Sequence, residues 1–136
     1  MSLRCAVAGL NRGAQFVRLL QANEHCEVVA VCDARPAKLE EFAPIAGFTE
    51  FEPMLAEARP DLVTIITPGP LHAPQSLAAL EAGAHVLVET PNVYSTEQAR
   101  AIVELTRARG LKYMLAEDYI YMGWCRRLAE VVAAGT

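Results

Sequence analysis

The sequence lacks the features of membrane proteins and nucleic-acid-binding proteins. Its 136 residues contain no apolar run near the roughly 18 to 20 residues that a membrane helix needs. The N-terminus also lacks a signal-peptide layout. The net charge is −4, and no block of basic residues stands out. We therefore expect neither a membrane nor a nucleic acid among its partners.

Cysteine and histidine are scarce and poorly spaced for a metal site. The four cysteines form no Cys-x-x-Cys pair, and the three histidines are scattered. Cys5 and Cys32 fall within apolar runs, where small core thiols are common. We therefore predict no metal site and expect a cytoplasmic protein, because reduced cysteines are typical of that compartment.

The chain is organised around residues 3–33. An apolar run at residues 3–8 precedes a glycine-containing turn at residues 9–14, and after a helical run a second apolar run ends at Asp33. Short apolar runs without alternation are typical of strands buried on both faces of a parallel sheet. This order predicts a dinucleotide-binding βαβ unit, where a helix N-terminus receives the pyrophosphate and the acid bonds the ribose 2′-hydroxyl.

The glycine turn matches the G-x-G-x-x-G/A fingerprint incompletely. Gly9 and Ala14 occupy its first and third positions, but Asn11 stands where the second glycine belongs. Asparagine adopts positive φ more readily than most residues, so the turn can form, although its side chain would crowd the phosphate. Gly13 is expected to let the loop adjust. The motif alone leaves nucleotide binding and a purely structural turn open, and Asp33 favours binding.

The rest of the chain alternates between predicted strands and helices. A capping-box sequence, Ser95-Thr96-Glu97-Gln98, opens one of these helices. Alternation of this kind predicts an α/β fold, a single doubly wound domain with a mostly parallel sheet. Further strands are expected at residues 48–51, 62–66, 85–89 and 112–116, and helices at residues 14–23, 36–47, 53–58, 70–83 and 96–110. A last helix, with an apolar stripe of Cys125, Leu128, Ala129 and Val132, is expected before Gly135.

Two longer segments carry a more specific pattern. Residues 61–72 read DLVTIITPGPLH, and residues 79–91 read ALEAGAHVLVETP. With residues 29–33 and 116–119, they closely resemble the N-terminal domain of the glucose–fructose oxidoreductase/inositol dehydrogenase (Gfo/Idh/MocA) family. The resemblance extends over residues 4–135. It implies a Rossmann domain that binds NAD(P), and hydride transfer to or from a sugar, a cyclitol or a related hydroxyl or carbonyl compound.

The resemblance also implies a set of cofactor contacts. The glycine turn would lie beside the pyrophosphate, Asp33 would hold the adenosine ribose, and Glu89 would sit near the nicotinamide ribose. For His72, a contact with the cofactor groove and a bond to local backbone are equally supported. Glu89 ends a buried strand, where an unpaired carboxylate would be costly. The predicted cofactor-binding residues are Gly9, Asn11, Arg12, Gly13, Ala14, Asp33, Thr67, Pro68, His72 and Glu89.

The predicted cofactor is NAD in preference to NADP. A carboxylate at Asp33 repels a 2′-phosphate. Arg12 and Arg35 lie close in the sequence and would reverse this preference if either paired with the phosphate. Arg35 is instead expected to be a solvated surface residue.

Two departures from the family bear on catalysis. Family members usually read Glu-Lys-Pro where this chain reads Glu89-Thr90-Pro91, and that lysine bonds the substrate hydroxyl and assists proton transfer. A threonine hydroxyl changes no charge near neutral pH, and Tyr119 and Tyr121 are more typical of packing, so the catalytic residues are unknown. The family's C-terminal substrate domain is also absent from the 136 residues. A truncation, a split protein and a free-standing domain all stay open.

We therefore expect residues 1–136 to form one dinucleotide-binding domain of an oxidoreductase that is not catalytic by itself. A stand-alone dinucleotide-binding pseudoenzyme and an interaction module are the alternatives. The expected partners are a dinucleotide, a separate chain carrying the substrate domain, and a second copy of the chain. Self-association is expected because a face left without its second domain exposes apolar surface.

Overall fold

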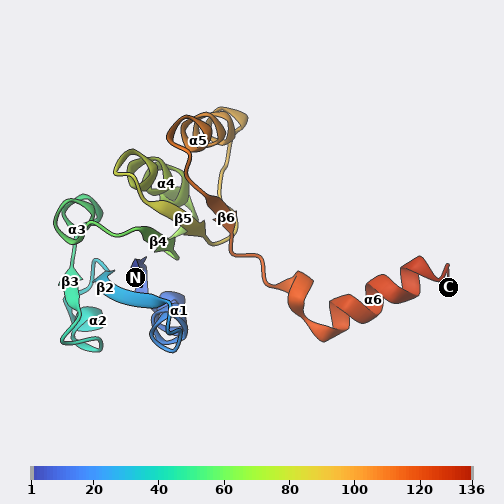
Figure 1. The fold of residues 1–136 in the computed structure, drawn as a ribbon, viewed down its shortest axis with the longest axis horizontal. Coiled ribbons are helices and arrows are strands. Elements are labelled where there is room, and N and C mark those ends of the chain that lie inside the picture. The colour runs from blue at the N-terminus through green and yellow to red at the C-terminus, as the bar shows by residue number, and fades with distance from the viewer. Residues whose placement is uncertain (1, 136) are drawn as a thin grey trace.

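A computed structural model describes residues 2–135 and contains one six-stranded sheet. Every neighbouring pair of strands is parallel, and the strand order is β3-β2-β1-β4-β5-β6 (Figure 1). This arrangement confirms the predicted doubly wound α/β fold. The strands are β1 (Leu3–Ala8), β2 (Cys26–Cys32), β3 (Ala46–Phe48), β4 (Leu62–Ile65), β5 (His85–Val88) and β6 (Tyr113–Leu115).

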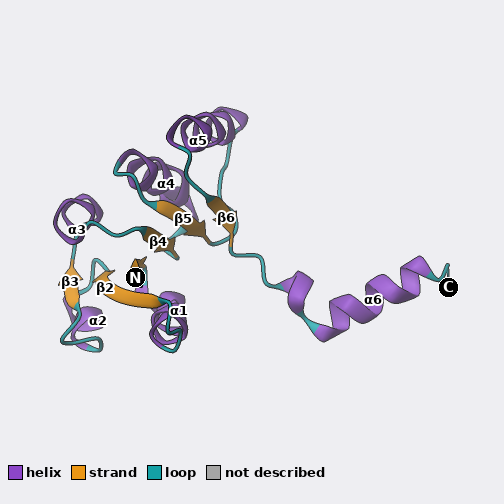
Figure 2. Cartoon of the chain, viewed as in Figure 1, coloured by secondary structure: helices purple, strands orange, loops and turns teal. Residues whose placement is uncertain are grey.

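Helices cover the sheet on two sides. Because the order of strands reverses at β1, right-handed connections send the helices of the two halves to opposite faces. Figure 2 shows α1 and α2 on one side of the strands, and α3, α4 and α5 on the other. The helices are α1 (Leu10–Gln21), α2 (Pro36–Glu40), α3 (Phe51–Ala58), α4 (His72–Glu81), α5 (Thr96–Arg109) and α6 (Gly123–Ala133), with short 3₁₀ turns η1 (Gly69–Leu71) and η2 (Tyr119–Tyr121).

The strands are buried on both faces, as their unbroken apolar runs predict. Along β1, Ala6 and Ala8 belong to the core beneath α3, α4 and α5, whereas Val7 belongs to the core beneath α1 and α2. This division follows from the period of two along a strand. The strands are thus packed by core side chains on both faces of the sheet. The loops that leave the carboxyl ends of the strands form the site described below.

Some expected boundaries are wrong, most clearly in the short elements. Helix α1 begins at Leu10 rather than after Gly13, because the Gly13 N–H already donates to the Gly9 carbonyl at 3.1 Å. The helix expected to end at Gly47 stops at Glu40. Gly47 itself belongs to β3, where it pairs with Val31 of β2. The strand expected at residues 48–51 lies instead at residues 46–48, and α3 starts two residues earlier than expected.

The final helix extends away from the sheet. Figure 1 shows α6 leaving the domain after β6 and η2. Its apolar stripe is largely in solvent, with side chains such as Leu128 and Val132 exposed, and no described residue of α6 is buried. The apolar surface expected from the sequence is therefore present. Across residues 2–135, no helix has both the length and the apolar character needed to cross a membrane.

Candidate functional site

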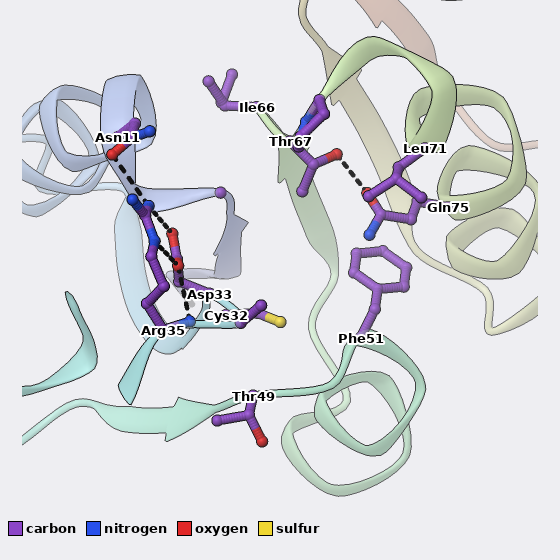
Figure 3. A pocket seen from close by; sticks show the side chains of 13 residues that line it. Asn11, Cys32, Asp33, Arg35, Thr49, Phe51, Ile66, Thr67, Leu71 and Gln75 are labelled. Atoms are coloured by element: carbon purple, nitrogen blue, oxygen red, sulfur yellow. Dashed lines mark hydrogen bonds and ion pairs between the residues drawn. The ribbon is translucent and has the colours of Figure 1, made fainter. Parts of the chain in front are cut away.

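A cavity of about 490 Å³ opens at the carboxyl ends of β1, β2 and β4. The strand order reverses at this point, which is where ligands bind in open α/β sheets. Figure 3 shows side chains that follow β1, β2, β3 and β4 facing one another across it. The cavity is lined by Gly9, Asn11, Cys32, Asp33, Ala34, Arg35, Thr49, Phe51, Ile66, Thr67, Pro68, Leu71 and Gln75.

Gly9 is required by the turn that joins β1 to α1. Its φ is +87°, and a Cβ built there would lie 2.5 Å from the Ile66 carbonyl oxygen. Its N–H donates to the Cys32 carbonyl at 2.8 Å, which ties the turn to the end of β2. A residue with a side chain meets both backbone strain and a clash here. Because Gly9 carries no side chain, an anion can approach the N-terminus of α1 at the cavity edge, where a negative charge is favoured.

Gly13 allows α1 to lie close to β1. It is buried, and a Cβ there would lie 3.1 Å from Val7 Cγ1. Ala14, which was assigned to the third fingerprint position, is partly buried and packs against the core under α1. Neither residue lines the cavity. Their contribution to a pyrophosphate site stays a prediction.

The Asp33 carboxylate lies at the end of β2 and is 7% exposed. Oδ1 accepts hydrogen bonds from Arg35 N at 3.0 Å and Arg35 Nε at 2.9 Å. Oδ2 accepts from Leu10 N at 2.9 Å and Arg35 Nη2 at 3.0 Å. The bonds from the Arg35 side chain, aided by the Leu10 and Arg35 backbone N–H groups, outweigh burial and lower the pKa of Asp33 from 3.8 to about 2. The group is therefore a carboxylate at neutral pH.

Arg35 is held in place instead of being free in solvent. Its side chain is 54% exposed, yet its fork grips Asp33, and Nη2 also donates to Asn11 Oδ1 at 3.0 Å. The side chain is exposed at the surface, as expected, and the contacts with Asp33 and Asn11 were not predicted. The Asn11 side chain reaches across to the end of β2, toward Arg35, as Figure 3 shows.

The opposite wall comes from the segment after β4. Thr67 Oγ1 donates to Gln75 Oε1 at 2.6 Å, which links the loop to the first turns of α4. Phe51 and Leu71 add apolar surface to the cavity, with Leu71 beside Gln75 (Figure 3). The result is a slot with apolar sides and an acid at one end. A flat heteroaromatic ring attached to a diol fits that chemistry.

His72 lies behind the cavity wall. It is 1% exposed, its Nδ1 is 2.8 Å from the Pro91 carbonyl oxygen, and its Nε2 is 2.6 Å from the Thr67 carbonyl oxygen. The sequence left open a contact with the cofactor groove and a bond to local backbone, and the structure shows the backbone contacts. Both ring nitrogens face the main chain, and the ring ties the loop after β4 to the loop after β5.

Arg12 and Glu89 meet at a second, smaller hollow of about 240 Å³. Arg12 Nη1 is 2.9 Å from Glu89 Oε1, so this strand-end carboxylate has a cation beside it, one of the two roles that its cost when unpaired favours. Glu89 Oε2 is buried without a hydrogen-bond partner in the described chain. Because Arg12 faces Glu89, Arg35 rather than Arg12 is the cation beside Asp33. Thr90 follows Glu89 at the end of β5 and is exposed.

Cys5 and Cys32 belong to the buried framework of the sheet. Burial raises the pKa of Cys5 to about 12 and that of Cys32 to about 11, so both thiols stay protonated at neutral pH. All four cysteines are free. Within residues 2–135, no group of three or more His, Cys, Asp or Glu side chains is arranged to hold a metal ion.

Sequence reasoning missed part of the cavity. Thr49 and Phe51 follow the end of β3, and Gln75 lies eight residues after Thr67. Their position in the sequence could have identified them, because residues just beyond the carboxyl ends of parallel strands line the same crevice. The misplaced β3 boundary hid the first two.

The family described as "Oxidoreductase family, NAD-binding Rossmann fold" matches residues 3–117. The D-glucoside 3-dehydrogenase of Escherichia coli (strain K12) is 35% identical over 126 residues, which cover 86% of this chain and 34% of that protein. A D-xylose 1-dehydrogenase (NADP(+)) of Haloferax volcanii is 32% identical over 119 residues, which cover 85% of this chain and 36% of that protein. The chain thus spans about a third of the length of these curated relatives.

A solved structure agrees on the fold. The scyllo-inositol dehydrogenase of Lactobacillus casei, with bound NAD(H) and scyllo-inositol, superposes with a TM-score of 0.87 at 23% identity. The match covers 99% of this chain and 42% of that one. At this identity the likeness establishes the architecture alone, and it includes the strands and loops that form the cavity.

Proposed function

The chain belongs to the Gfo/Idh/MocA oxidoreductase family as its NAD-binding Rossmann domain, and from that membership we propose that it is the cofactor half of a hydride-transferring enzyme. The proposed substrates are sugars, cyclitols or related hydroxyl and carbonyl compounds. Two relatives support this class by name, since one is a D-glucoside dehydrogenase and the other a D-xylose dehydrogenase.

The observation that carries the proposal is the cavity that ends at Asp33. Its residues fit a dinucleotide: Gly9 leaves no Cβ between the turn and an incoming phosphate, and Asp33 offers a carboxylate to a ribose diol. The apolar sides formed by Phe51 and Leu71 suit an adenine ring. The bound nicotinamide would supply the hydride acceptor or donor.

We propose that the residues at the carboxyl edge of the sheet contact different parts of the dinucleotide. Gly9 and Asn11, at the start of α1, lie beside the pyrophosphate, and Thr67 and Pro68 form the facing wall. His72 positions that wall through its bond to the Thr67 carbonyl. The Arg12–Glu89 pair, at the end of β5, faces the nicotinamide half.

NAD is the proposed preference over NADP. The Asp33 carboxylate is ionised at neutral pH, and its negative charge opposes a 2′-phosphate. Arg35 offsets part of that charge, so we expect a preference and not an absolute exclusion. Within the family both cofactors occur, because the Haloferax volcanii relative is named for NADP(+).

We propose that proton transfer to or from the substrate depends on groups outside these 136 residues. Thr90 occupies the position of the family's lysine and is a poor general acid or base. A substrate domain, in a separate chain or in the same protein, is the proposed source. Binding without turnover, as in a pseudoenzyme, is the second candidate that Thr90 favours. A cytoplasmic location suits the four free thiols.

The test is thermal unfolding in the presence of NAD or NADP, with Asp33→Ala alongside. A ligand at a hundredfold excess over its dissociation constant stabilises the folded state by about 2.7 kcal/mol, which raises the melting temperature by several degrees. We expect a rise with NAD that shrinks in Asp33→Ala. No rise with either dinucleotide would contradict the proposal, and an equal rise in the variant would remove Asp33 from the site.

A further inference from the structure

We propose that Asn11 is a specificity-determining residue, which weakens the preference for NAD over NADP by holding the Arg35 guanidinium over Asp33. The inference deepens the proposed function and rests on dinucleotide binding at this cavity. It assigns a task to the residue that breaks the glycine fingerprint. The three side chains of Asn11, Asp33 and Arg35 are called the clamp below (Figure 3).

In the clamp, Arg35 takes the place that a ribose would need. Each carboxylate oxygen of Asp33 accepts two hydrogen bonds, and one bond at each oxygen comes from the Arg35 side chain, at 2.9 and 3.0 Å. The 2′- and 3′-hydroxyls of an adenosine ribose would donate to these same oxygens. NAD must therefore displace the Arg35 fork before Asp33 can accept the diol.

Asn11 makes that displacement harder. Arg35 Nη2 donates both to Asp33 Oδ2 and to Asn11 Oδ1, each at 3.0 Å, so the amide fixes the outer end of the fork. A glycine at position 11 would offer no such acceptor. Asn11 is also neutral, so it fixes the guanidinium without adding a negative charge that would repel phosphate.

The same arrangement favours a 2′-phosphate. The bonds within the clamp use Arg35 Nε and Nη2, and Nη1 takes no part in them. A guanidinium with free donors pairs well with phosphate, and Asp33 beneath it is already charge-compensated. The clamp thus penalises NAD and accommodates NADP, and its loss should increase the NAD preference.

The experiment measures the dissociation constants of NAD and NADP by calorimetry at fixed ionic strength. The proteins compared are the wild type, Asn11→Gly, Asn11→Ala, Arg35→Ala and the double variant Asn11→Ala/Arg35→Ala. The readout is the ratio of the NADP constant to the NAD constant. A change at position 11 that affects both ligands equally, through the shared pyrophosphate, cancels in this ratio.

We expect Arg35→Ala to raise the ratio by about tenfold or more, because a charge-assisted bond to phosphate is lost while Asp33 is freed. Both Asn11 variants should raise it by a smaller factor. In the double variant the ratio should equal that of Arg35→Ala, since Asn11 acts through Arg35. Arg127→Ala, on exposed α6 and paired with Glu130, should leave the ratio at the wild-type value.

The outcomes separate this inference from the function on which it rests. If the wild type binds a dinucleotide but the Asn11 variants leave the ratio unmoved, or if their effect persists in full without Arg35, the inference is overturned. If the wild type binds neither dinucleotide, the proposed function itself fails. Two substitutions at position 11 guard against a folding defect, because alanine suits the exposed first turn of α1 better than glycine does.

Discussion

At the scale of single residues, Asp33 ties the stability of the fold to pH. Its hydrogen bonds hold the folded pKa near 2, against an ordinary value of 3.8, so the ionised form is favoured in the folded state. The resulting stabilisation is present above about pH 4 and is lost as the pH falls toward 2.

We therefore expect Asp33→Asn to lower the free energy of unfolding at neutral pH by about 1–2 kcal/mol, a range that discounts the half-exposed Arg35. Between pH 4 and pH 2, the variant should lose less stability than the wild type does. Urea unfolding at pH 6, 4, 3 and 2.5 measures both effects. Glu104→Gln, at an exposed acid of α5, is the control. If the free energy of unfolding of Asp33→Asn falls with pH as steeply as that of the wild type does, this account is contradicted.

The residues of the site differ in how far the sequence could reveal them. Gly9 and Asp33 were predictable because backbone geometry and strand-end position restrict those places to few residue types. Arg35 is exposed as expected, but its pairing was not predictable, because only the folded turn brings the guanidinium onto the Asp33 carboxylate. For Arg12 the sequence left the partner open, and Glu89 is separated from it by 77 positions.

At the scale of elements, the sequence predicted the ends of a helix reliably where capping residues mark them. The expected helix after Ser95 is present: the Ser95 hydroxyl accepts from the Gln98 N–H at 3.3 Å, and Gly110 ends it with a φ of +64°. In contrast, α2 and β3 are five and three residues long. Their ends are set by pairing of Gly47 with Val31 across the sheet, which no local pattern records.

His72 ties the loop after β4 to the loop after β5. We expect His72→Phe to destabilise the fold by about 1–3 kcal/mol, because the buried ring loses its hydrogen bonding to the part-buried Thr67 and Pro91 carbonyl oxygens while the volume is kept. His72→Gln keeps one donor and should be destabilised less. Chemical denaturation of both variants tests this, with exposed His25→Phe as the control. If His72→Phe proves as stable as the wild type, the ring does not serve as a tie.

At the scale of the whole molecule, apolar side chains are treated differently before and after β6. Through β6 the strands and helices bury their apolar faces in two clusters. Beyond β6, Trp124, Leu128 and Val132 are 59%, 56% and 69% exposed. Monomeric proteins rarely leave large apolar surface of this kind uncovered.

We therefore expect the chain to self-associate through α6. Removing apolar surface from water contributes roughly 25 cal/mol per Å², so pairing two such stripes yields a concentration-dependent dimer. Leu128→Glu/Val132→Glu places charge on the stripe and should shift sedimentation equilibrium to the monomer. Val103→Glu, at an exposed valine of α5, should not. If the wild type stays monomeric at every concentration tested, two α6 stripes do not pair, and a substrate domain becomes the better candidate to cover this face.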